Sequence, residues 1–288
     1  MSDEWTVRRI LDWTTAHLKK HGSDTPRLDT EILLAHARGC RRIELYTRFD
    51  DVLSERERTS MRDLVRRRAQ SEPVAYLVGH REFFGLDFHV TPAVLIPRPD
   101  TETLVLQLLD AAKPLAAPRI LDIGTGSGCI AIAAAVNNRA AQITATDLSE
   151  EALAVARENA QSHKVLDRIR FLRGNLFEPC GQVERFDVVA SNPPYIADRE
   201  KETLQNDVRR YEPHAALFSG PTGLEILFQI IDGAASHLTV GGALMLEISP
   251  EQASAVTERM GSIGRYEAIR VVKDLAGQAR VVVSRRKG

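Results

Sequence analysis

The feature that most constrains this fold is the alternation of short β-type runs with helical segments after about residue 118. The segments 130–136 and 150–162 have helical composition. They separate runs of strand composition at residues 119–123, 142–146, 169–172 and 186–190. Strands that alternate with helices pack as a parallel sheet with helices on both faces. The sequence therefore predicts an α/β fold for this part of the chain.

The last part of the chain continues the rhythm and then breaks it. Residues 223–237 and 251–260 have the pattern of helices, and residues 243–248 have that of a strand. Two further β-type runs, 266–272 and 278–284, follow without a helix between them. Two consecutive strands joined directly are expected to form an antiparallel hairpin, here at the edge of the sheet.

The first part of the chain has a different pattern. Apolar residues spaced by three and four positions before residue 68 predict two or three short helices, and Ser54 is expected to cap the last of them. Alternation over residues 82–90 predicts a short hairpin around Gly85, followed by a proline-stiffened connector. We therefore expect a helical N-terminal domain over residues 1–81, the hairpin and connector over residues 82–99, and the α/β domain over residues 100–288.

Composition excludes several classes of protein. The 288 residues are 43% hydrophobic and 27% charged, which is typical of a globular chain, and the formal net charge of -1 gives no general attraction to nucleic acid. Cys40, Cys129 and Cys180 form no closely spaced pair that would indicate a zinc or redox unit, so no metal is expected. No apolar run is long enough to cross a bilayer. We expect a cytoplasmic protein without a membrane partner.

A glycine-rich loop, Asp-Ile-Gly-Thr-Gly-Ser-Gly, follows the first strand of the α/β part at residues 122–128. Glycine permits a tight turn and lets a ligand lie against the backbone at the carboxyl end of a strand. The dinucleotide fingerprint would need glycine where Cys129 stands, and no Gly-Lys-Ser/Thr sequence follows to form a phosphate loop. The loop predicts a small-molecule site and argues against both a dinucleotide and ATP.

Asp147 ends the second strand, nineteen positions after Gly128. A carboxylate at this position can accept hydrogen bonds from both hydroxyls of a ribose, although a lone aspartate here could equally cap the next helix. Together with the acid at Asp122, it favours a cationic nucleoside ligand over a phosphorylated one, because the loop offers few donors for phosphate. S-adenosylmethionine fits that description.

The most specific motif is Asn192-Pro193-Pro194-Tyr195, directly after the fourth strand. Parallel strands point their carboxyl ends one way, so this motif is expected to face the same crevice as the glycine loop. The side-chain carbonyl of Asn192 and the backbone carbonyl of Pro193 can accept both hydrogens of an NH₂ group and aim its nitrogen at a methyl donor. Tyr195 offers a ring to stack on a planar group. A rigid turn with a buried tyrosine is the structural alternative.

These motifs together resemble those of the bacterial release factor glutamine methyltransferases, and the similarity covers most of the chain. The segments that carry it are residues 82–86, 94–102, 122–128, 192–195, 211–214 and 274–277. The resemblance implies a class I S-adenosylmethionine-dependent methyltransferase fold, with a seven-stranded, mostly parallel sheet, an antiparallel edge hairpin and a small helical domain that binds the protein substrate. It implies methylation of the side-chain amide nitrogen of the glutamine in the Gly-Gly-Gln loop of class I release factors. S-adenosylhomocysteine would be the other product, and neither metal nor direct nucleic-acid binding would be required.

The resemblance also assigns site residues. The donor-binding residues it implies are Gly124, Thr125, Gly126, Ser127 and Gly128 for the methionine part, Asp147 for the ribose, Asn175 and Leu176 beside the adenine, and Asn192. The glutamine would be held by Asn192, Pro193, Pro194 and Tyr195, among which Asn192, Pro193 and Tyr195 are the expected catalytic residues. Leu176 stands where some relatives have an aromatic residue, and Ile248-Ser249 stands where His-Gly is frequent.

Two other functions compete with this interpretation. Methyltransferases that act on adenine N6 or guanine N2 also use Asn-Pro-Pro-Tyr, with the tyrosine stacked on an extruded base. The near-neutral charge and the lack of a separate basic domain argue against nucleic acid. A non-catalytic binding module is the other alternative, and the intact glycine loop and Asn192 argue against it.

Overall fold

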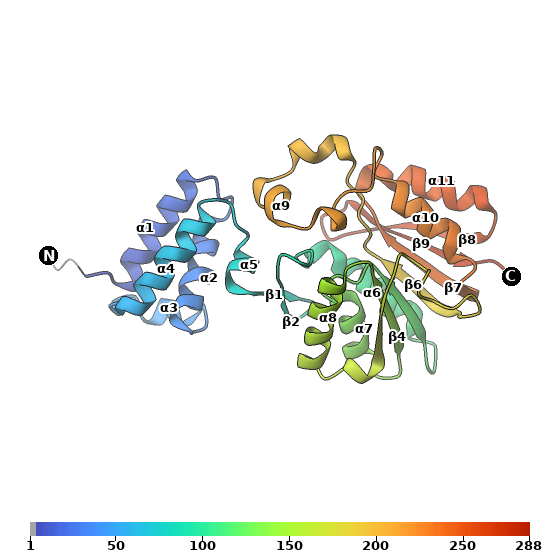
Figure 1. Cartoon of the computed structure of the whole chain (residues 1–288), viewed down its shortest axis with the longest axis horizontal. Helices are drawn as coiled ribbons and strands as arrows, with labels where there is room; N and C mark the ends of the chain where they lie inside the picture. The colour runs from blue at the N-terminus through green and yellow to red at the C-terminus, as the bar shows by residue number, and fades with distance from the viewer. Residues whose placement is uncertain (1–3) are drawn as a thin grey trace. The chain divides into compact units, whose positions relative to one another are not determined.

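The computed structural model describes residues 4–288 and divides the chain into two compact units. One unit comprises the chain up to His80 together with Gln205–Tyr211, and the other comprises Arg81–Leu204 and Glu212–Gly288 (Figure 1). The first three residues of the expected helical domain lie outside the described part. Within residues 4–288, none of the helices is both long and apolar enough to span a membrane.

The first unit is a bundle of helices around its own apolar core. Its helices are α1 (Val7–Lys20), α2 (Pro26–Arg38), α3 (Glu44–Thr47), α4 (Glu55–Arg68), α5 (Val74–Val78) and α9 (Asn206–Tyr211). Leu11, Leu33 and Met61, from three different helices, are among the buried residues of this core. The expected cap at Ser54 is confirmed. The Ser54 side chain accepts a hydrogen bond from the backbone N–H of Glu57, and the Glu57 carboxylate accepts one from the backbone N–H of Ser54.

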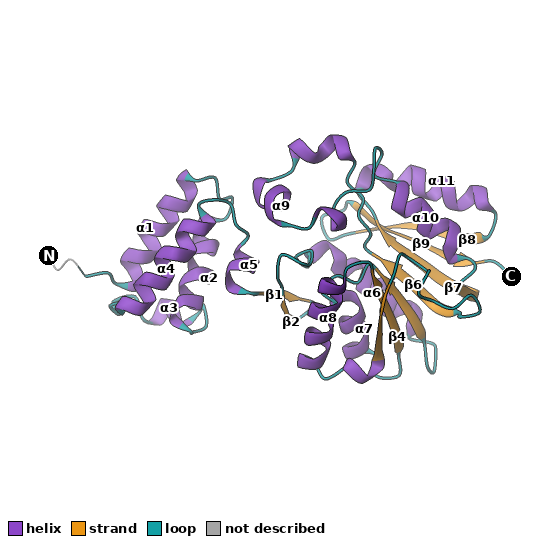
Figure 2. Cartoon of the chain, in the orientation of Figure 1, coloured by secondary structure: helices purple, strands orange, loops and turns teal. Residues whose placement is uncertain are grey.

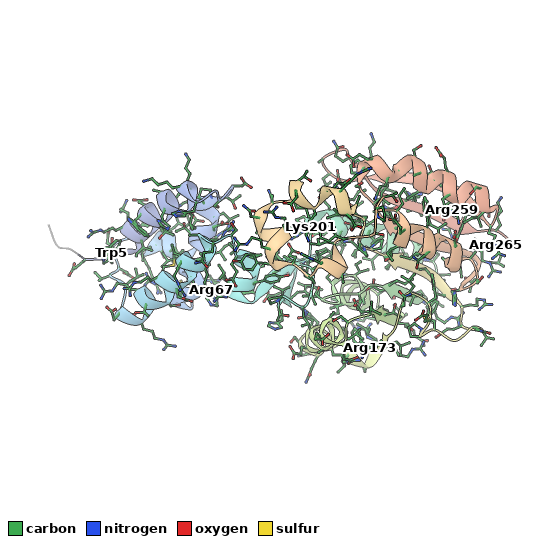
Figure 3. All side chains as sticks on the ribbon, turned by 45° about the horizontal axis from the view of Figure 1, so that its top comes forward. Trp5, Arg67, Arg173, Lys201, Arg259 and Arg265 are labelled. Atoms are coloured by element: carbon green, nitrogen blue, oxygen red, sulfur yellow. The ribbon has the colours of Figure 1, made fainter. Side chains whose placement is uncertain are left out.

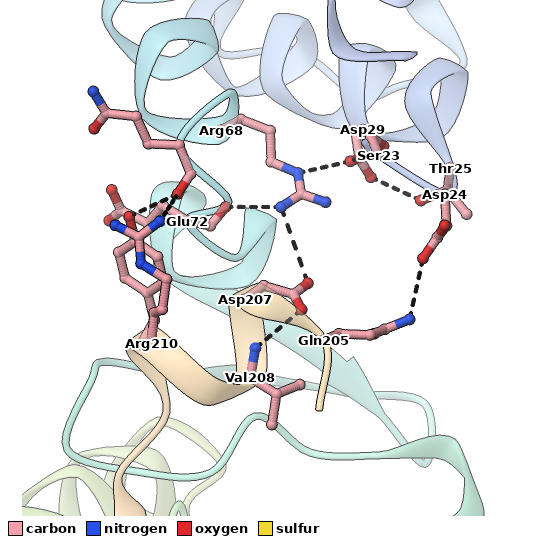
Figure 4. Close-up of polar contacts among 12 residues, drawn as sticks. Ser23, Asp24, Thr25, Asp29, Arg68, Glu72, Gln205, Asp207, Val208 and Arg210 are labelled. Carbon is pink, nitrogen blue, oxygen red and sulfur yellow. Dashed lines mark hydrogen bonds and ion pairs between the residues drawn. The ribbon is translucent and has the colours of Figure 1, made fainter. Parts of the chain in front are cut away.

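Helix α9 is the unexpected member of this unit, because it comes from the middle of the α/β sequence. Arg68 on α4 lies 2.8 Å from Asp29 on α2 and 4.0 Å from Asp207 on α9. Gln205 donates to Asp24, 181 positions away, at 3.1 Å. Figure 4 shows these contacts joining the loop before α2, the end of α4 and the start of α9. No local sequence pattern indicated this grouping, because it depends on contacts between distant segments.

The second unit has a sheet whose strand order is β5-β4-β3-β6-β7-β9-β8. Its strands are β3 (Arg119–Ile123), β4 (Gln142–Asp147), β5 (Ile169–Arg173), β6 (Phe186–Ser191), β7 (Leu238–Glu247), β8 (Tyr266–Lys273) and β9 (Ala279–Arg286). The first five strands in that order are parallel, and β9 is antiparallel to both β7 and β8. The predicted fold class is confirmed, including the antiparallel hairpin with β8 at the sheet's edge.

Helices cover both faces of this sheet (Figure 2). The helices on one face are α6 (Glu102–Ala112), α7 (Cys129–Asn137) and α8 (Glu150–Ser162), and those on the other are α10 (Glu225–Ala234) and α11 (Ala253–Ile263). Neighbouring strand residues serve opposite faces: Ile120 packs in the first apolar layer and Leu121 in the second. Arg259 on α11, labelled in Figure 3, pairs with Asp232 on α10 at 2.5 Å.

The predicted hairpin around Gly85 is confirmed as β1 (His80–Phe83) and β2 (Leu86–His89). Phe84 and Gly85, the two turn residues, both have positive φ, 53° and 71°, as a tight two-residue hairpin turn requires. The backbone N–H of Phe84 donates to Glu102 at the start of α6, at 2.9 Å. Short 3-10 helices lie at Pro99–Thr101 (η1), Leu166–Arg168 (η2), Asp198–Thr203 (η3), His214–Ala216 (η4) and Pro250–Gln252 (η5).

Candidate active site

A cavity of about 470 Å³ opens at the carboxyl ends of the central strands of the second unit. Four segments line it, one after each of β3, β4, β5 and β6: residues 123–127, 146–149, 174–176 and 191–194. Strand β3 has β4 on one side and β6 on the other, so the cavity lies where the chain order of the strands reverses, which is where ligands bind in open α/β sheets. The structure thus brings the glycine loop, Asp147, Asn175, Leu176 and Asn192 to one cavity.

The three glycines of the loop have positive φ, but they serve two purposes. At Gly124 (φ +70°) and Gly126 (φ +54°), which line the cavity, an added Cβ would meet no protein atom within 4 Å. A ligand can therefore approach the backbone at these two positions. Gly128 (φ +83°) does not line the cavity; a Cβ there would lie 2.9 Å from Ile132 and 3.2 Å from the Cβ of Ala156. Gly128 is thus needed for close packing of α7 against α8.

Asp147 occupies the end of β4, and its carboxylate holds the backbone of the glycine loop. Its Oδ2 accepts a hydrogen bond from the Gly126 N–H at 2.8 Å, and its Oδ1 accepts one from the Ser149 N–H at 3.0 Å. Burial raises the pKa of this carboxyl. The cap of α8 is Ser149, whose side chain accepts from the Ala152 N–H. Asp147 is therefore not the helix cap that the sequence left open, and it lines the cavity.

Asp122 does not line the cavity, although the sequence suggested that it contributes, with Asp147, to a site for a cationic ligand. It is fully buried, and its Oδ2 accepts from the Thr125 hydroxyl at 2.6 Å and from the Ala131 N–H at 3.2 Å. Desolvation raises the pKa of Asp122 to about 7, against the effect of these hydrogen bonds. Asp122 thus braces the turn from β3 into α7.

Asn175 and Leu176 form the cavity wall after β5. Leu176 has a left-handed backbone, with φ of +49°, which costs a non-glycine residue about 1–3 kcal/mol. Its carbonyl accepts from the Thr146 hydroxyl at 3.3 Å, and its side chain packs against the apolar cluster beside α10. Leu176 therefore gives this part of the cavity wall an aliphatic surface.

The polar end of Asn192 is held by Thr101, which also lines the cavity. Asn192 Nδ2 donates to Thr101 Oγ1 at 3.1 Å. This leaves the carbonyl oxygen Oδ1 of Asn192 available to accept a hydrogen bond from a ligand. Pro193 and Pro194 follow in the cavity wall and contribute no N–H donors.

Tyr195 is not among the described residues that line the cavity. Its ring packs with the apolar cluster beside α10, and burial raises the pKa of its hydroxyl to about 12. The Tyr195 carbonyl accepts from Gln252 Nε2 at 2.9 Å, and Gln252 Oε1 accepts from the Ser249 N–H at 3.1 Å. The departure at Ile248-Ser249 thus has a structural role: Ile248 is buried, and Ser249 begins the turn that anchors the proline corner.

Two further motifs meet at the rim of this cavity. Arg98, which lines it, donates to the carboxylate of Glu212. Glu212 is buried and also accepts from the Ile96 N–H at 3.2 Å. This contact joins the proline-rich connector to the Tyr-Glu-Pro-His segment, two motifs whose function the sequence did not explain.

Asn159 on α8 was missed by the sequence reasoning. It is 1% exposed; its Nδ2 donates to the carbonyls of Ser127 and His89, and its Oδ1 accepts from the His89 N–H. It therefore ties the glycine loop to the end of the hairpin. The available signal was a polar residue on the apolar face of the helix, three positions after Ala156.

Among residues 4–288, no cluster of three or more histidine, cysteine, aspartate or glutamate side chains could hold a metal ion.

Two family models match the chain. The PrmC N-terminal domain model matches residues 9–79, and the Methyltransferase small domain model matches residues 98–210.

Curated relatives match over almost their whole length. The release factor glutamine methyltransferase of Rhodopirellula baltica is 46% identical over 282 residues, covering 96% of this chain and 95% of the relative. That of Geobacter sulfurreducens is 44% identical, covering 98% of this chain and 97% of the relative.

Solved structures show the same fold at low sequence identity. The hMettl16 catalytic domain, crystallised with a 3'UTR hairpin, has a TM-score of 0.57 at 18% identity and covers 78% of this chain and 82% of that chain. A T. thermophilus 16S rRNA N2 methyltransferase in complex with AdoMet and guanosine has a TM-score of 0.53 at 17% identity, over 72% of this chain and 50% of that chain. At this identity the similarity concerns the fold alone.

Proposed function

This chain belongs to the release factor glutamine methyltransferase family, and from that premise we propose that it methylates the Gly-Gly-Gln glutamine of bacterial class I release factors on its side-chain amide nitrogen. The methyl donor is S-adenosylmethionine, and the products are the N5-methylated glutamine and S-adenosylhomocysteine. The observation that carries the proposal is the orientation of Asn192. Its NH₂ group is engaged by Thr101, so a carbonyl oxygen remains for an incoming NH₂ group in the cavity that the glycine loop also lines.

The residues on the β3 and β4 side of the cavity fit the donor. The open backbone at Gly124 and Gly126 accommodates the methionine part, while Thr125 and Gly128 shape the loop around it. Ser127 Oγ, on the cavity wall, is buried without a hydrogen-bond partner within residues 4–288, which is consistent with a ligand partner.

The ribose and adenine would lie farther along the same wall. In the proposal, Asp147 accepts from the ribose hydroxyls, and Asn175 and Leu176 lie beside the adenine. When bound, S-adenosylmethionine supplies a methyl group activated by its positively charged sulfur.

On the β6 side, Asn192 Oδ1 and the Pro193 carbonyl would accept the two hydrogens of the glutamine amide. Because Pro193 and Pro194 have no N–H, this corner presents acceptors without competing donors. We retain Tyr195 in the proposal as the residue that closes the corner; its ring packs beside α10 and its carbonyl is anchored by Gln252. The two acceptors would fix both the plane of the amide and the direction in which its nitrogen faces.

The chemistry needs orientation more than a strong base. An amide nitrogen is a weak nucleophile because its lone pair is delocalised into the carbonyl. Holding it in line with the methyl group and away from water supplies much of the rate enhancement. After transfer the nitrogen is positively charged and acidic, and its proton passes to solvent water when the product leaves the cavity.

The remaining parts of the proposal concern the partner and its location. We assign protein-substrate binding to the helical domain, residues 1–81, with the hairpin and connector at residues 82–99 and the methyltransferase domain at residues 100–288. We place the protein in the cytoplasm, where release factors act. The three cysteines are free thiols, in agreement with a reducing compartment. The proposal requires no metal, no membrane and no direct nucleic-acid contact.

The test is methyl transfer from labelled S-adenosylmethionine to a bacterial class I release factor, to the same factor with its motif glutamine replaced by alanine, and to RNA and DNA. We expect label only in the release factor that keeps its motif glutamine. Asn192→Ala should lower kcat about a hundredfold while the donor still binds, because it removes an orienting acceptor. Asn137→Ala, exposed at the end of α7, is the control. Label in nucleic acid alone would contradict the proposal and favour the exocyclic-amine alternative.

A further inference from the structure

Arg98 is the one positively charged side chain that the structure places in the wall of the candidate site. Among the described residues that line the cavity, the side chains charged at neutral pH are Arg98, Asp147 and Glu151. A lone cation in a wall whose other charges are negative attracts a part of a ligand that the two acids would repel. Its position therefore calls for an explanation.

The backbone of Arg98 is held rigidly by its neighbours in the sequence. Pro97 and Pro99 flank it, and its backbone is extended, with φ of -101° and ψ of 141°, as expected for a residue before a proline. Its carbonyl accepts from the Thr101 N–H at 3.1 Å, in the turn that forms η1. The side chain thus starts from a fixed point in the wall.

Glu212 holds the other end of the Arg98 side chain. The Glu212 side chain is 1% exposed; its Oε1 accepts from Nη2 of Arg98, and its Oε2 accepts from the Ile96 N–H at 3.2 Å. Both carboxylate oxygens are therefore engaged, and the guanidinium has one preferred position. A buried carboxylate loses much of what its ion pair gains, because removing it from water is costly. The pair is better explained by the group that it positions than by stability.

The guanidinium keeps donors for a ligand. It has five N–H groups on three nitrogens, and within residues 4–288 only Nη2 has a hydrogen-bond partner. The Arg98 side chain is 34% exposed and lines the cavity. A planar guanidinium with Nε and Nη1 free matches the two oxygens of a carboxylate.

The rest of the wall offers little to an anion. Four backbone N–H groups of the glycine loop already donate within the protein at 2.8–3.0 Å, those of Gly124, Thr125, Gly126 and Gly128. The corner after β6 has no N–H at Pro193 and Pro194. The Ser127 hydroxyl can donate to a ligand, but it carries no charge. Arg98 is therefore the strongest anion-binding group in the described part of this wall.

The two molecules proposed to meet in the cavity differ in charge. A Gly-Gly-Gln segment has no anionic group, and its side-chain amide is neutral. S-adenosylmethionine carries one anionic group, the carboxylate of its methionine part. Charge complementarity therefore pairs Arg98 with the donor and not with the glutamine.

We propose that Arg98, held in place by Glu212, binds the carboxylate of the methyl donor, so that the site distinguishes donors that keep this group from donors that lack it. The inference rests on the proposed function for the identity of the donor. It does not depend on which molecule receives the methyl group, and it can be measured without a methyl acceptor.

The test is calorimetry of the full chain with two ligands that differ in this one group, S-adenosylmethionine and decarboxylated S-adenosylmethionine. We expect the parent to bind the carboxylated form about 10–100-fold more tightly, the gain typical of a hydrogen bond between charged groups. Arg98→Met keeps much of the side-chain length but removes the charge and the donors, so it should bind both ligands with similar Kd. Arg139→Met, at an exposed arginine just after α7 and outside the cavity wall, should keep the parental preference.

A second variant guards against a general structural effect. Arg98→Met leaves the buried Glu212 carboxylate without its cation, which destabilises the fold. Arg98→Met combined with Glu212→Gln removes both charges together. This double variant should show the same loss of preference, and urea unfolding of each variant should confirm that the protein measured in calorimetry is folded.

Kinetics separates this inference from the proposed function. With a release factor as acceptor, Arg98→Met should raise the KM for S-adenosylmethionine by the factor seen in Kd and leave kcat at saturating donor near the parental value. A full preference for the carboxylated form in both variants, or a parent that binds the two ligands equally, would overturn the inference while leaving methyl transfer intact. A parent that shows the preference but labels no release factor would support the inference and contradict the proposed function.

Discussion

Replacing Asn159 by alanine should both destabilise the α/β unit and weaken donor binding. The side chain makes three hydrogen bonds: 2.8 Å from the His89 N–H, 3.0 Å to the His89 carbonyl and 2.9 Å to the Ser127 carbonyl. At about 1 kcal/mol for each bond, the free energy of unfolding should fall by about 3 kcal/mol. The contact with Ser127 is the part that concerns the glycine loop. Its loss should weaken donor affinity by about fivefold, the equivalent of 1 kcal/mol.

The assay is urea unfolding followed by circular dichroism, with donor affinity measured by calorimetry. Gln161→Ala is the matched control, since this residue is exposed on the same helix. The control should change the free energy of unfolding by less than about 0.5 kcal/mol. If Asn159→Ala behaves like Gln161→Ala in both measurements, the bracing role assigned to Asn159 is wrong.

Three other predictions follow from the geometry of the loop. Asp147→Ala should raise the donor Kd about tenfold in calorimetry with little change in the rate at saturating donor; an unchanged Kd would remove Asp147 from the ribose site. Gly128→Ala should lower the free energy of unfolding by about 2–5 kcal/mol, from a strained positive φ and from overlap with Ile132, and parental urea stability would contradict this. Asp122→Asn should stabilise the fold increasingly from pH 4 to pH 7 and by a constant amount above it. The reason is that the folded carboxyl, with a pKa of about 7, stays protonated while the unfolded one, at 3.8, ionises; a pH-independent difference in unfolding free energy would argue against burial of an ionisable group.

Strand polarity is the part of this structure that could be predicted from the sequence. The glycine loop and Asn192 follow strands that are parallel neighbours, so a general rule of sheet topology brings them to one edge. Ser54 and Gly85 were predictable for a local reason, because capping and tight turns depend on a few consecutive residues.

The rest depends on contacts that no short pattern encodes. Asn159 reaches Ser127 and His89 only after α8 has packed beside the hairpin. Gln252 anchors the Tyr195 backbone carbonyl across 57 positions, and the Tyr195 ring packs with the α10 cluster. Asp122 is an acidic residue in the glycine loop, which suggested a contact with a ligand. Its burial beneath the loop depends on how the whole unit folds.

The most direct test of the central claim is tandem mass spectrometry of a class I release factor after incubation with this protein and S-adenosylmethionine. We predict one added methyl group, located on the side-chain amide nitrogen of the Gly-Gly-Gln glutamine, and absent when Asn192→Ala replaces the parent enzyme in a short incubation. A methyl group on another residue, or an unmodified release factor beside methylated RNA or DNA, would contradict the account.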